Sequence, residues 1–308
     1  MSAARPPEGA RTAARSAEVM SAADTPRNGH VQIRDVSVRF GAQGRMIEAA
    51  SRVSLEVKPG EFVSVIGPSG CGKSTLLNIV AGFIRPSDGQ ALLDDKPIGG
   101  PGADRGVVFQ QYSLFPWMTV RKNVEFGLKM QGLGRNQRES AARSLLGMTG
   151  LLSFENHYPD QLSGGMKQRV GIVRALATSP QVLLMDEPFG ALDSQTRAVM
   201  QEILTNMWQQ LQLSVLFITH DIEEAIFLSE KVYVMTARPG RIKAEVPIPL
   251  PRPRTPEMTA SPTFQALVRQ LKALIREESL AAMGGELGNG GLQGMDHHFG
   301  RDGMKALT

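Results

Sequence analysis

The sequence predicts an α/β fold with a mainly parallel central sheet, and two observations support this. Short, continuous apolar runs recur at residues 62–66, 182–185, 215–218 and 232–235, separated by helical or turn segments. Such runs are typical of strands that helices bury on both faces. The first run leads directly into a glycine-rich loop, and residues at helical spacing follow that loop. Strand, loop and helix in this order indicate one repeat of an α/β sheet.

The composition is that of a globular protein with a sizeable core. Of the 308 residues, 42% are hydrophobic and 21% are charged, and the net charge is only +4. This mild positive charge is weak evidence for a nucleic-acid partner, and we expect none. The single cysteine, Cys71, excludes an internal disulfide, lacks the neighbours of a zinc site and favours a reducing, cytosolic compartment. No apolar run approaches the roughly 18 residues that span a bilayer.

Composition also predicts how the chain is divided. Residues 1–29 mix Arg, Ala, Pro and Ser without the apolar core of a secretory signal, so we expect a disordered extension. The ordered domain covers residues 30–250 and starts with an alternating strand from Val31, which has one break in phase. Within it, residues 111–178 carry Arg, Glu, Leu and Ala at helical spacing without strand runs, and this predicts a helical insertion.

The tail, residues 251–308, is expected to contain one amphipathic helix and a disordered end. Ser261 is the expected cap, Pro262 the first helical residue, and Phe264 the first of several apolar residues on one face. From Met283 onward the chain is rich in glycine, which predicts disorder.

Residues 67–75 have the pattern of a phosphate-binding loop between a buried strand and a helix. The segment consists of Gly67, Pro68, Ser69, Gly70, Cys71, Gly72, Lys73, Ser74 and Thr75. Glycines let backbone N–H groups converge on an anion, and the helix N-terminus adds its dipole. Lys73 is predicted to reach the β- and γ-phosphates, and the Ser74 hydroxyl to bind Mg²⁺.

An acidic pair is the second element of this chemistry. Asp186 and Glu187 follow the apolar run 182–185, at the C-terminal end of a strand, where α/β sheets bind ligands. We expect Asp186 to hold Mg²⁺, directly or through water. Glu187 is expected to act as the general base that polarises the attacking water.

The segment 162–169 (LSGGMKQR) resembles the signature motif of ABC-type ATPases. Asp186-Glu187, the run 191–193 and His220 follow at that family's spacing, and the similarity extends from about Val31 to Leu250. Met166 replaces the commoner Gln of the motif, and Cys71 lies inside the phosphate loop, but neither change removes a group with a chemical role. The resemblance implies a P-loop NTPase core with an N-terminal antiparallel β subdomain and an inserted helical subdomain, binding ATP and Mg²⁺.

The same resemblance assigns roles to further residues. It places Phe40 against adenine and gives Gln110 to the loop that joins Mg²⁺ to a membrane partner. His220 would bond the γ-phosphate or the attacking water. The predicted catalytic residues are thus Glu187, His220, Lys73 and Gln110, the metal ligands Ser74, Gln110 and Asp186, and the nucleotide contacts Phe40, residues 67–75, Ser163, Gly164, Gly165 and Asp193.

Ser163 and the glycines behind it have a physical interpretation of their own. Ser163 is expected to cap a helix that begins near Gly165 and thereby to form a second anion site, for which its own chain has no second nucleotide. The resemblance supplies the partner. Two such domains would dock head to tail as a homodimer, so that Ser163–Gly165 of one chain closes on the γ-phosphate held by Lys73 of the other.

ABC-type proteins include motors of membrane transporters, chromosome or DNA-repair proteins, and translation factors. Chromosome and DNA-repair proteins separate their ATPase halves by long coiled coils, and translation factors fuse two cassettes; neither feature is found in this sequence. A motor that binds separate permease chains is left. Four segments, at residues 113–120, 220–225, 237–241 and 250–254, resemble bacterial importers of nitrate, alkanesulfonate and taurine.

This narrower resemblance implies a peripheral protein on the cytoplasmic face of the inner membrane. Its partners would be transmembrane permease subunits and, indirectly, a periplasmic solute-binding protein. The motor of another importer, or of a detached exporter, is the alternative. The transported solute would never contact this chain, so its identity is not encoded in these residues.

Overall fold

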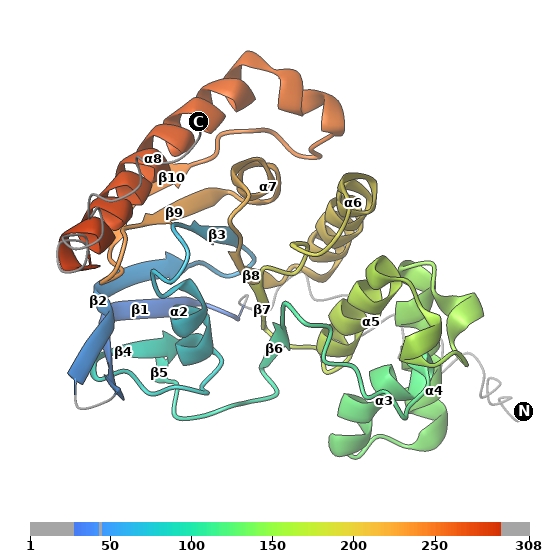
Figure 1. Ribbon diagram of the computed structural model, residues 1–308. Helices are drawn as coiled ribbons and strands as arrows, with labels where there is room; N and C mark the ends of the chain where they lie inside the picture. Colours follow the sequence, from blue (N-terminus) through green and yellow to red (C-terminus); the bar gives the residue numbers. More distant parts are fainter. Residues whose placement is uncertain (1–27, 43–44, 291–308) are drawn as a thin grey trace, which may run out of the picture.

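A computed structural model describes residues 28–42 and 45–290, arranged around two β-sheets (Figure 1). The larger sheet has the order β10 (Ile242–Pro247), β9 (Lys231–Met235), β3 (Phe62–Ile66), β8 (Ser214–Ile218), β7 (Val182–Asp186) and β6 (Arg105–Val108). All neighbours are parallel except β10, which runs antiparallel to β9. The four apolar runs of the sequence are central strands of this sheet, as predicted.

The second sheet is antiparallel and comes from the N-terminal part of the chain. Its order is β2 (Arg45–Val57), β1 (Val31–Ala42), β4 (Asp88–Leu93) and β5 (Lys96–Pro97). The break in phase predicted for the first strand is a register shift between Ile33 and Val36, where Asp35 has a φ of 49°. The extra residue lets Val36 return to the buried face.

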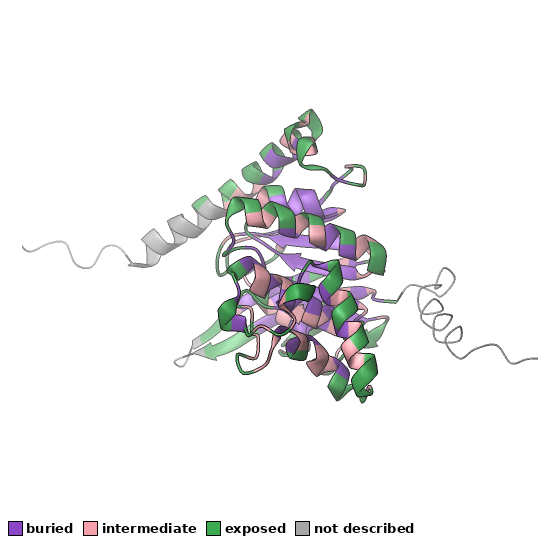
Figure 2. Ribbon diagram, turned by 90° about the vertical axis from the view of Figure 1, so that its right-hand side faces the viewer, coloured by how far each residue is buried: buried purple, intermediate pink, exposed green. Residues whose placement is uncertain are grey.

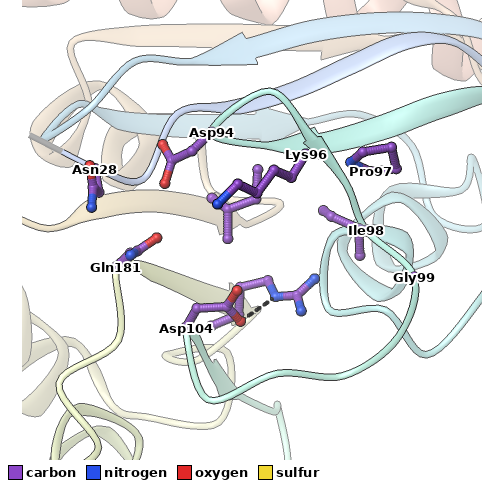
Figure 3. A pocket seen from close by; sticks show the side chains of 10 residues that line it. Asn28, Asp94, Lys96, Pro97, Ile98, Gly99, Asp104 and Gln181 are labelled. Carbon is purple, nitrogen blue, oxygen red and sulfur yellow. Dashed lines mark hydrogen bonds and ion pairs between the residues drawn. The ribbon is translucent and has the colours of Figure 1, made fainter.

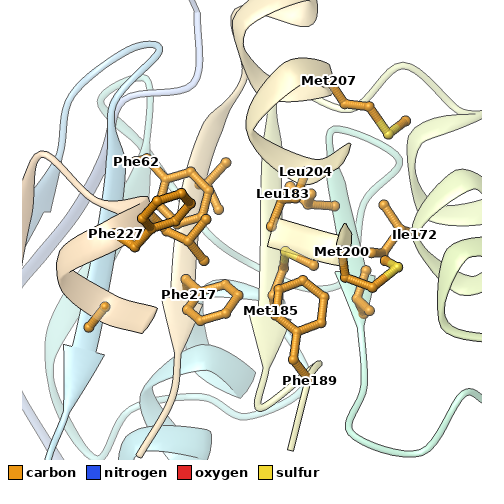
Figure 4. Packing of buried hydrophobic residues seen from close by; sticks show 14 of the residues in the cluster. Phe62, Ile172, Leu183, Met185, Phe189, Met200, Leu204, Met207, Phe217 and Phe227 are labelled. Carbon is orange, nitrogen blue, oxygen red and sulfur yellow. The ribbon is translucent and has the colours of Figure 1, made fainter. Parts of the chain in front are cut away.

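The parallel sheet is covered on both faces, and alternate residues of its strands supply two separate cores. On one face Val63 and Val65 pack with α2 (Lys73–Val80) and the antiparallel sheet. On the other face Phe62 and Phe217 pack toward α5 (Gly164–Leu176), α6 (Ser194–Leu211) and α7 (Ile222–Leu228), as Figure 4 shows. Figure 2 shows the strands buried and the outward sides of the helices exposed.

Between β6 and β7 the chain forms a helical region beside the sheet (Figure 1). It consists of α3 (Val120–Met130), α4 (Arg135–Met148), the short helices η1 (Leu152–Phe154) and η2 (Pro159–Gln161), and α5. Its buried residues, among them Val124, Leu146 and Leu151, belong to the same apolar cluster as Phe62 and Phe217. The helical region and the sheet therefore share one core.

The C-terminal segment returns over the parallel sheet as η3 (Pro256–Ala260) and α8 (Pro262–Gly290), and α8 packs on α7 and β9. Two arginines anchor its beginning. The Arg252 guanidinium lies 4.5 Å from the centre of the Trp208 ring, and Arg254 donates hydrogen bonds to the last carbonyls of α7 and to Ser229. The predicted cap is confirmed, since Ser261 Oγ accepts from the Phe264 N–H at 3.3 Å.

One boundary of this helix differs from the prediction. Helix α8 runs to Gly290, although glycine content predicted disorder from Met283. Extending a formed helix is far easier than nucleating one, and α8 continues through Gly284, Gly285 and Gly288 to Gly290 although each glycine costs about 1 kcal/mol. Residues 1–27 and 291–308, where most of the predicted disorder falls, lie outside the described residues. Across the described segments, no helix combines the length and the apolarity that crossing a membrane requires.

Candidate functional site

Three neighbouring parallel strands bring the predicted catalytic groups to one edge of the sheet. Strand β3 ends in the phosphate loop, β8 leads to His220, and β7 ends at Asp186 and Glu187. Because β8 lies between β3 and β7, the carboxyl ends of all three meet at the same edge, where ligands of α/β sheets bind. The topology therefore assembles a site from segments more than 100 residues apart.

The phosphate loop takes a shape that only glycine permits at its key positions. Gly70 and Gly72 have φ values of 73° and 101°. A Cβ at Gly72 would lie 2.8 Å from the Ala49 carbonyl oxygen. No side chain caps the start of α2, so the N–H groups of its first turn are open to a ligand. The loop is a cradle of the kind that binds phosphate.

Lys73 is held inside this cradle. Only 6% of the residue is exposed, and its Nζ donates to the carbonyl oxygens of Gly67 and Pro68, both at 2.9 Å. The ammonium is thus already desolvated and in place beside the open amides. The neighbouring Cys71 is buried, and burial raises the pKa of its thiol, so the thiol stays neutral next to the lysine.

Ser74 and Asp186 form the next pair. Ser74 Oγ donates to Asp186 Oδ1 at 3.1 Å. Burial raises the pKa of the Asp186 carboxyl, an effect that the Ser74 hydrogen bond opposes. A poorly solvated carboxyl beside a hydroxyl is a favourable pair of oxygen ligands for a hard cation. The two residues therefore fit Mg²⁺.

Glu187 and His220 are also in contact. His220 Nδ1 lies 3.2 Å from Glu187 Oε2. Glu187 has a φ of 44°, uncommon for a residue with a side chain, and its N–H donates to the Ile218 carbonyl at 2.9 Å. This backbone geometry turns the carboxyl toward the phosphate loop. The histidine is the more exposed of the two, with 62% of its side chain accessible against 24% for Glu187.

A pocket of about 410 Å³ lies beside these groups, and neither Asp186 nor His220 lines it directly. Of the predicted residues, Phe40, Ser69, Gly70, Gly72, Lys73, Ser74, Thr75 and Glu187 line it. Three lining residues, Ile47, Ala49 and Arg238, were not predicted. The sequence analysis noted the segment 237–241, which contains Arg238, but only because it resembles importers and not as part of the nucleotide site. No local pattern indicated that Arg238 would reach the phosphate loop.

The other predicted site residues lie outside the pocket lining. Gln110 is exposed just beyond β6. Asp193 caps α6 by accepting from the Thr196 N–H at 2.9 Å, which lowers the pKa of its carboxyl. Ser163 caps α5, as predicted, with its Oγ accepting from the Met166 N–H at 3.3 Å. Gly164 follows it in an exposed position, and Gly165 is buried.

The segment after Gln110 rests on α5. Arg174 of this helix donates to the Ser113 carbonyl at 2.6 Å, and its guanidinium lies 5.5 Å from the centre of the Phe115 ring. Phe115 in turn packs against Trp117, of which 71% is exposed. An exposed aromatic surface is thereby fixed to the helix that begins at Ser163.

A second pocket, of about 290 Å³, lies at the opposite edge of the sheet (Figure 3). It is formed by the turn between β4 and β5 and by the beginnings of β6 and β7. Three of its charged groups have partners: Asp94 accepts from the N–H groups of Gly29 and His30, and Arg105 bonds Asp104 and two backbone carbonyls. Lys96 also lines this pocket, which lacks the glycine cradle and the acidic residues of the site at the phosphate loop.

A phosphate loop with a buried lysine, a Ser–Asp pair and a Glu–His pair at one sheet edge defines the class of protein as a nucleotide-binding P-loop ATPase. Comparison with known proteins narrows the class to a family. Residues 50–190 match the family described as ABC transporter. The chain is 49% identical over 253 residues to the nitrate import ATP-binding protein of Synechocystis sp., covering 80% of this chain and 95% of that protein.

Two further matches agree. The taurine import ATP-binding protein of Rhizobium johnstonii is 49% identical over 252 residues, which cover 80% of this chain and 96% of the relative. A dimeric ATP-binding cassette in a post-hydrolysis state with ADP and Pi matches with a TM-score of 0.64 and 35% identity, over 71% of this chain and 98% of the other. The chain therefore belongs to the ABC transporter ATP-binding protein family. The resemblance and the fold class predicted from the sequence are confirmed.

Proposed function

We propose that this protein is the ATP-hydrolysing motor of a bacterial ABC importer for nitrate, alkanesulfonate or taurine-like solutes, and that it acts on separate permease subunits. The observation that carries the proposal is the assembly of the Ser74–Asp186 and Glu187–His220 pairs at the phosphate loop. The 49% identity to nitrate and taurine import proteins, which extends over 95% and 96% of their lengths, supports the choice of solute class.

Nucleotide binding falls to the residues around the pocket. The amides of the loop and Lys73 hold the phosphates, and Phe40, which is 41% exposed at the pocket wall, stacks on adenine. Ser74, Asp186 and Gln110 would hold Mg²⁺, which supplies neutralisation of phosphate charge when bound. Among the described residues, no group of three or more His, Cys, Asp or Glu side chains could hold a metal. A magnesium site built on one carboxylate and a hydroxyl is consistent with that, because Mg²⁺ commonly takes its remaining ligands from phosphates and water.

Hydrolysis requires a base beside the terminal phosphate. Glu187 lines the pocket and accepts the proton of the attacking water. His220 holds the Glu187 carboxyl through the contact between Nδ1 and Oε2, so the base keeps one orientation while the proton moves. Lys73 stabilises charge that develops on the phosphate oxygens in the transition state.

The second chain completes the site. The capped start of α5 does not line the pocket of its own chain, and Ser163 and Gly164 are exposed there. In a head-to-tail homodimer, Ser163–Gly165 and Asp193 of one chain would close over the nucleotide of the other. The structural neighbour is itself a dimer, which supports this assembly.

Coupling to the membrane follows from the aromatic surface at Phe115 and Trp117. We propose that a cytoplasmic helix of the permease binds this surface. The protein would then be peripheral, on the cytoplasmic face of the inner membrane. Because Arg174 ties this surface to α5, closure of the dimer at Ser163 would move the permease contact. A periplasmic solute-binding protein would deliver the solute, and its gene next to this one would identify an importer rather than an exporter.

The variant Glu187→Gln tests the proposal. The amide keeps the shape of the carboxyl but cannot accept the proton, so ATP turnover should fall by about 10²- to 10⁴-fold while ATP affinity is kept. Dimers with bound ATP should accumulate and be seen by size-exclusion chromatography. Glu223→Gln, an exposed carboxyl at the start of α7, is the matched control. Turnover of the Glu187 variant within a few-fold of wild type would contradict the assignment.

A further inference from the structure

The turn between β9 and β10, residues 236–241, packs directly on the phosphate loop. A Cβ at Gly240 would lie 1.9 Å from the Cys71 carbonyl oxygen, so only glycine allows this approach. The Arg238 side chain reaches across the same surface, and its Nε and Nη2 donate to the Gly70 carbonyl at 3.2 and 3.0 Å. One turn thus contacts two successive parts of the loop that holds phosphate.

Arg238 also brings a positive charge to the pocket. Its side chain is exposed and lines the cavity together with Lys73 and Thr75. No carboxylate of a described residue pairs with it, and its Nη1 has no hydrogen-bond partner in the described part of the chain. A guanidinium with free donors at the wall of a phosphate pocket is suited to an anionic ligand, because its planar fork matches phosphate oxygens.

The turn is held by a hydrogen bond within itself and by another to the C-terminal helix. Thr236 Oγ1 accepts from the Arg241 N–H at 3.0 Å, which closes the turn on itself. From α8, Glu278 Oε2 accepts from the Ala237 N–H at 3.0 Å, and its other oxygen pairs with Lys243 of β10 at 2.7 Å. Glu277 also pairs with Lys243 but has no hydrogen bond or ion pair to the described residues of the turn.

We propose that Arg238 is a nucleotide-contacting residue that binds the phosphates of ATP, and that Glu278 of α8 is a positioning residue that holds the Arg238 turn against the phosphate loop. The proposal rests on the proposed function, since it deepens the same site. It gives the C-terminal helix a part in nucleotide binding, although none of the α8 side chains that the structure describes lines the pocket. The chain of contacts runs from Glu278 through Ala237 and Arg238 to Gly70.

Titration of the full-length chain with ATP tests the first half. Arg238→Ala should weaken ATP binding by roughly tenfold, the loss expected for one charge-assisted hydrogen-bonding group. The ATP affinity of this variant should also fall less steeply with KCl concentration than that of the wild type. A merely structural role of Arg238 would not change this salt dependence. Arg238→Lys keeps the charge and should recover part of the loss. Arg241→Ala, an exposed arginine of the same turn outside the pocket, should bind like wild type.

Glu278→Ala tests the second half. It should weaken ATP binding less than Arg238→Ala does, and it should add nothing further in the Arg238→Ala background, because both changes act through one contact. Glu278→Gln keeps an oxygen for the Ala237 N–H and should restore affinity. Glu277→Ala, which loses only the Lys243 contact, is the matched control.

The outcomes separate this inference from the proposed function. A wild-type chain that binds no ATP would overturn the proposed function itself. Wild-type binding with unchanged affinity, or an unchanged salt dependence, in Arg238→Ala would overturn only the role of Arg238. Full additivity of the Glu278 and Arg238 changes, or equal losses from Glu277→Ala and Glu278→Ala, would overturn positioning by α8.

Discussion

Helices α2 and α5 both begin at a glycine-containing turn, but their starts differ in local chemistry. Before α2, Gly72 adopts a left-handed conformation and no side chain caps the helix. Before α5, Ser163 is extended and its hydroxyl oxygen accepts from the Met166 N–H. The first start is packed into the protein, with Cys71 and Lys73 buried, whereas Ser163 and Gly164 are exposed.

The difference shows how one chain can carry a complete anion site and half of another. At α2 the amides, the lysine and the Ser74 hydroxyl all converge within one loop. At α5 the serine oxygen already satisfies one amide, but its O–H remains a donor, and no buried cation accompanies it. The α2 start thus has the groups to bind phosphate alone, while in the proposed dimer the α5 start would serve a phosphate that the other chain holds.

Among the variants that test this difference between the two helix starts, Lys73→Ala should have the largest effect on ATP binding. It removes the one buried cation of the α2 site, so ATP affinity should fall by roughly 100-fold, with hydrolysis lost as a consequence. Calorimetric titration with ATP measures it, and Lys122→Ala, an exposed lysine of α3, is the control. Unchanged affinity would mean that the loop does not depend on its lysine and that the two helix starts are equivalent.

Ser163→Arg addresses the α5 start, and here the two activities should separate. Hydrolysis should fall by about 10²- to 10³-fold because a second wall of donors to the γ-phosphate is lost. ATP affinity of the monomer should remain near that of wild type, since the α2 loop is untouched. Loss of ATP affinity together with hydrolysis would show that Ser163 acts within its own chain.

Mixing Ser163→Arg chains with Glu187→Gln chains sharpens the test. In a head-to-tail heterodimer both defects fall on one composite site, and the other site is intact, so some hydrolysis should return. If heterodimers form and the mixture stays as inactive as its parents, either the assignment across the dimer fails or both sites must act together. A heterodimer with one Glu187→Gln chain and one wild-type chain decides between these outcomes, because its single intact site is active only if sites act independently.

The smallest expected effect concerns the glycines of the two starts. Gly72→Ala places a Cβ in a left-handed conformation 2.8 Å from a backbone oxygen, and it should lower the free energy of unfolding by about 1–3 kcal/mol. Gly164→Ala meets side chains alone, the Tyr112 hydroxyl at 3.0 Å and Leu192 at 4.0 Å, and should cost less than about 1 kcal/mol. Urea unfolding followed by circular dichroism compares them, and equal losses would contradict the contrast.

Local pattern was enough to predict the strands and the loop, because each depends on a run of neighbouring residues. The apolar strands, the capped start at Ser163 and the joining of Asp186 to Ser74 follow from strand ends and helix starts. Arg238 could not be predicted in the same way. Its contact with Gly70 depends on how the end of β9 packs beside the phosphate loop, and the spacing of residues in the sequence does not predict that packing. The length of α8 was missed because glycine content was given more weight than helix propagation.

The two tryptophans of the chain lie in contrasting surroundings. Trp117 is mostly in contact with solvent, whereas Trp208 packs edge-on against Phe62 and under the Arg252 guanidinium. Their intrinsic fluorescence should therefore differ in wavelength, with Trp117 emitting toward the red and Trp208 toward the blue. Replacing each in turn would give one optical signal for binding at the aromatic surface and another for release of Arg252 and the C-terminal segment that follows it, without an attached dye.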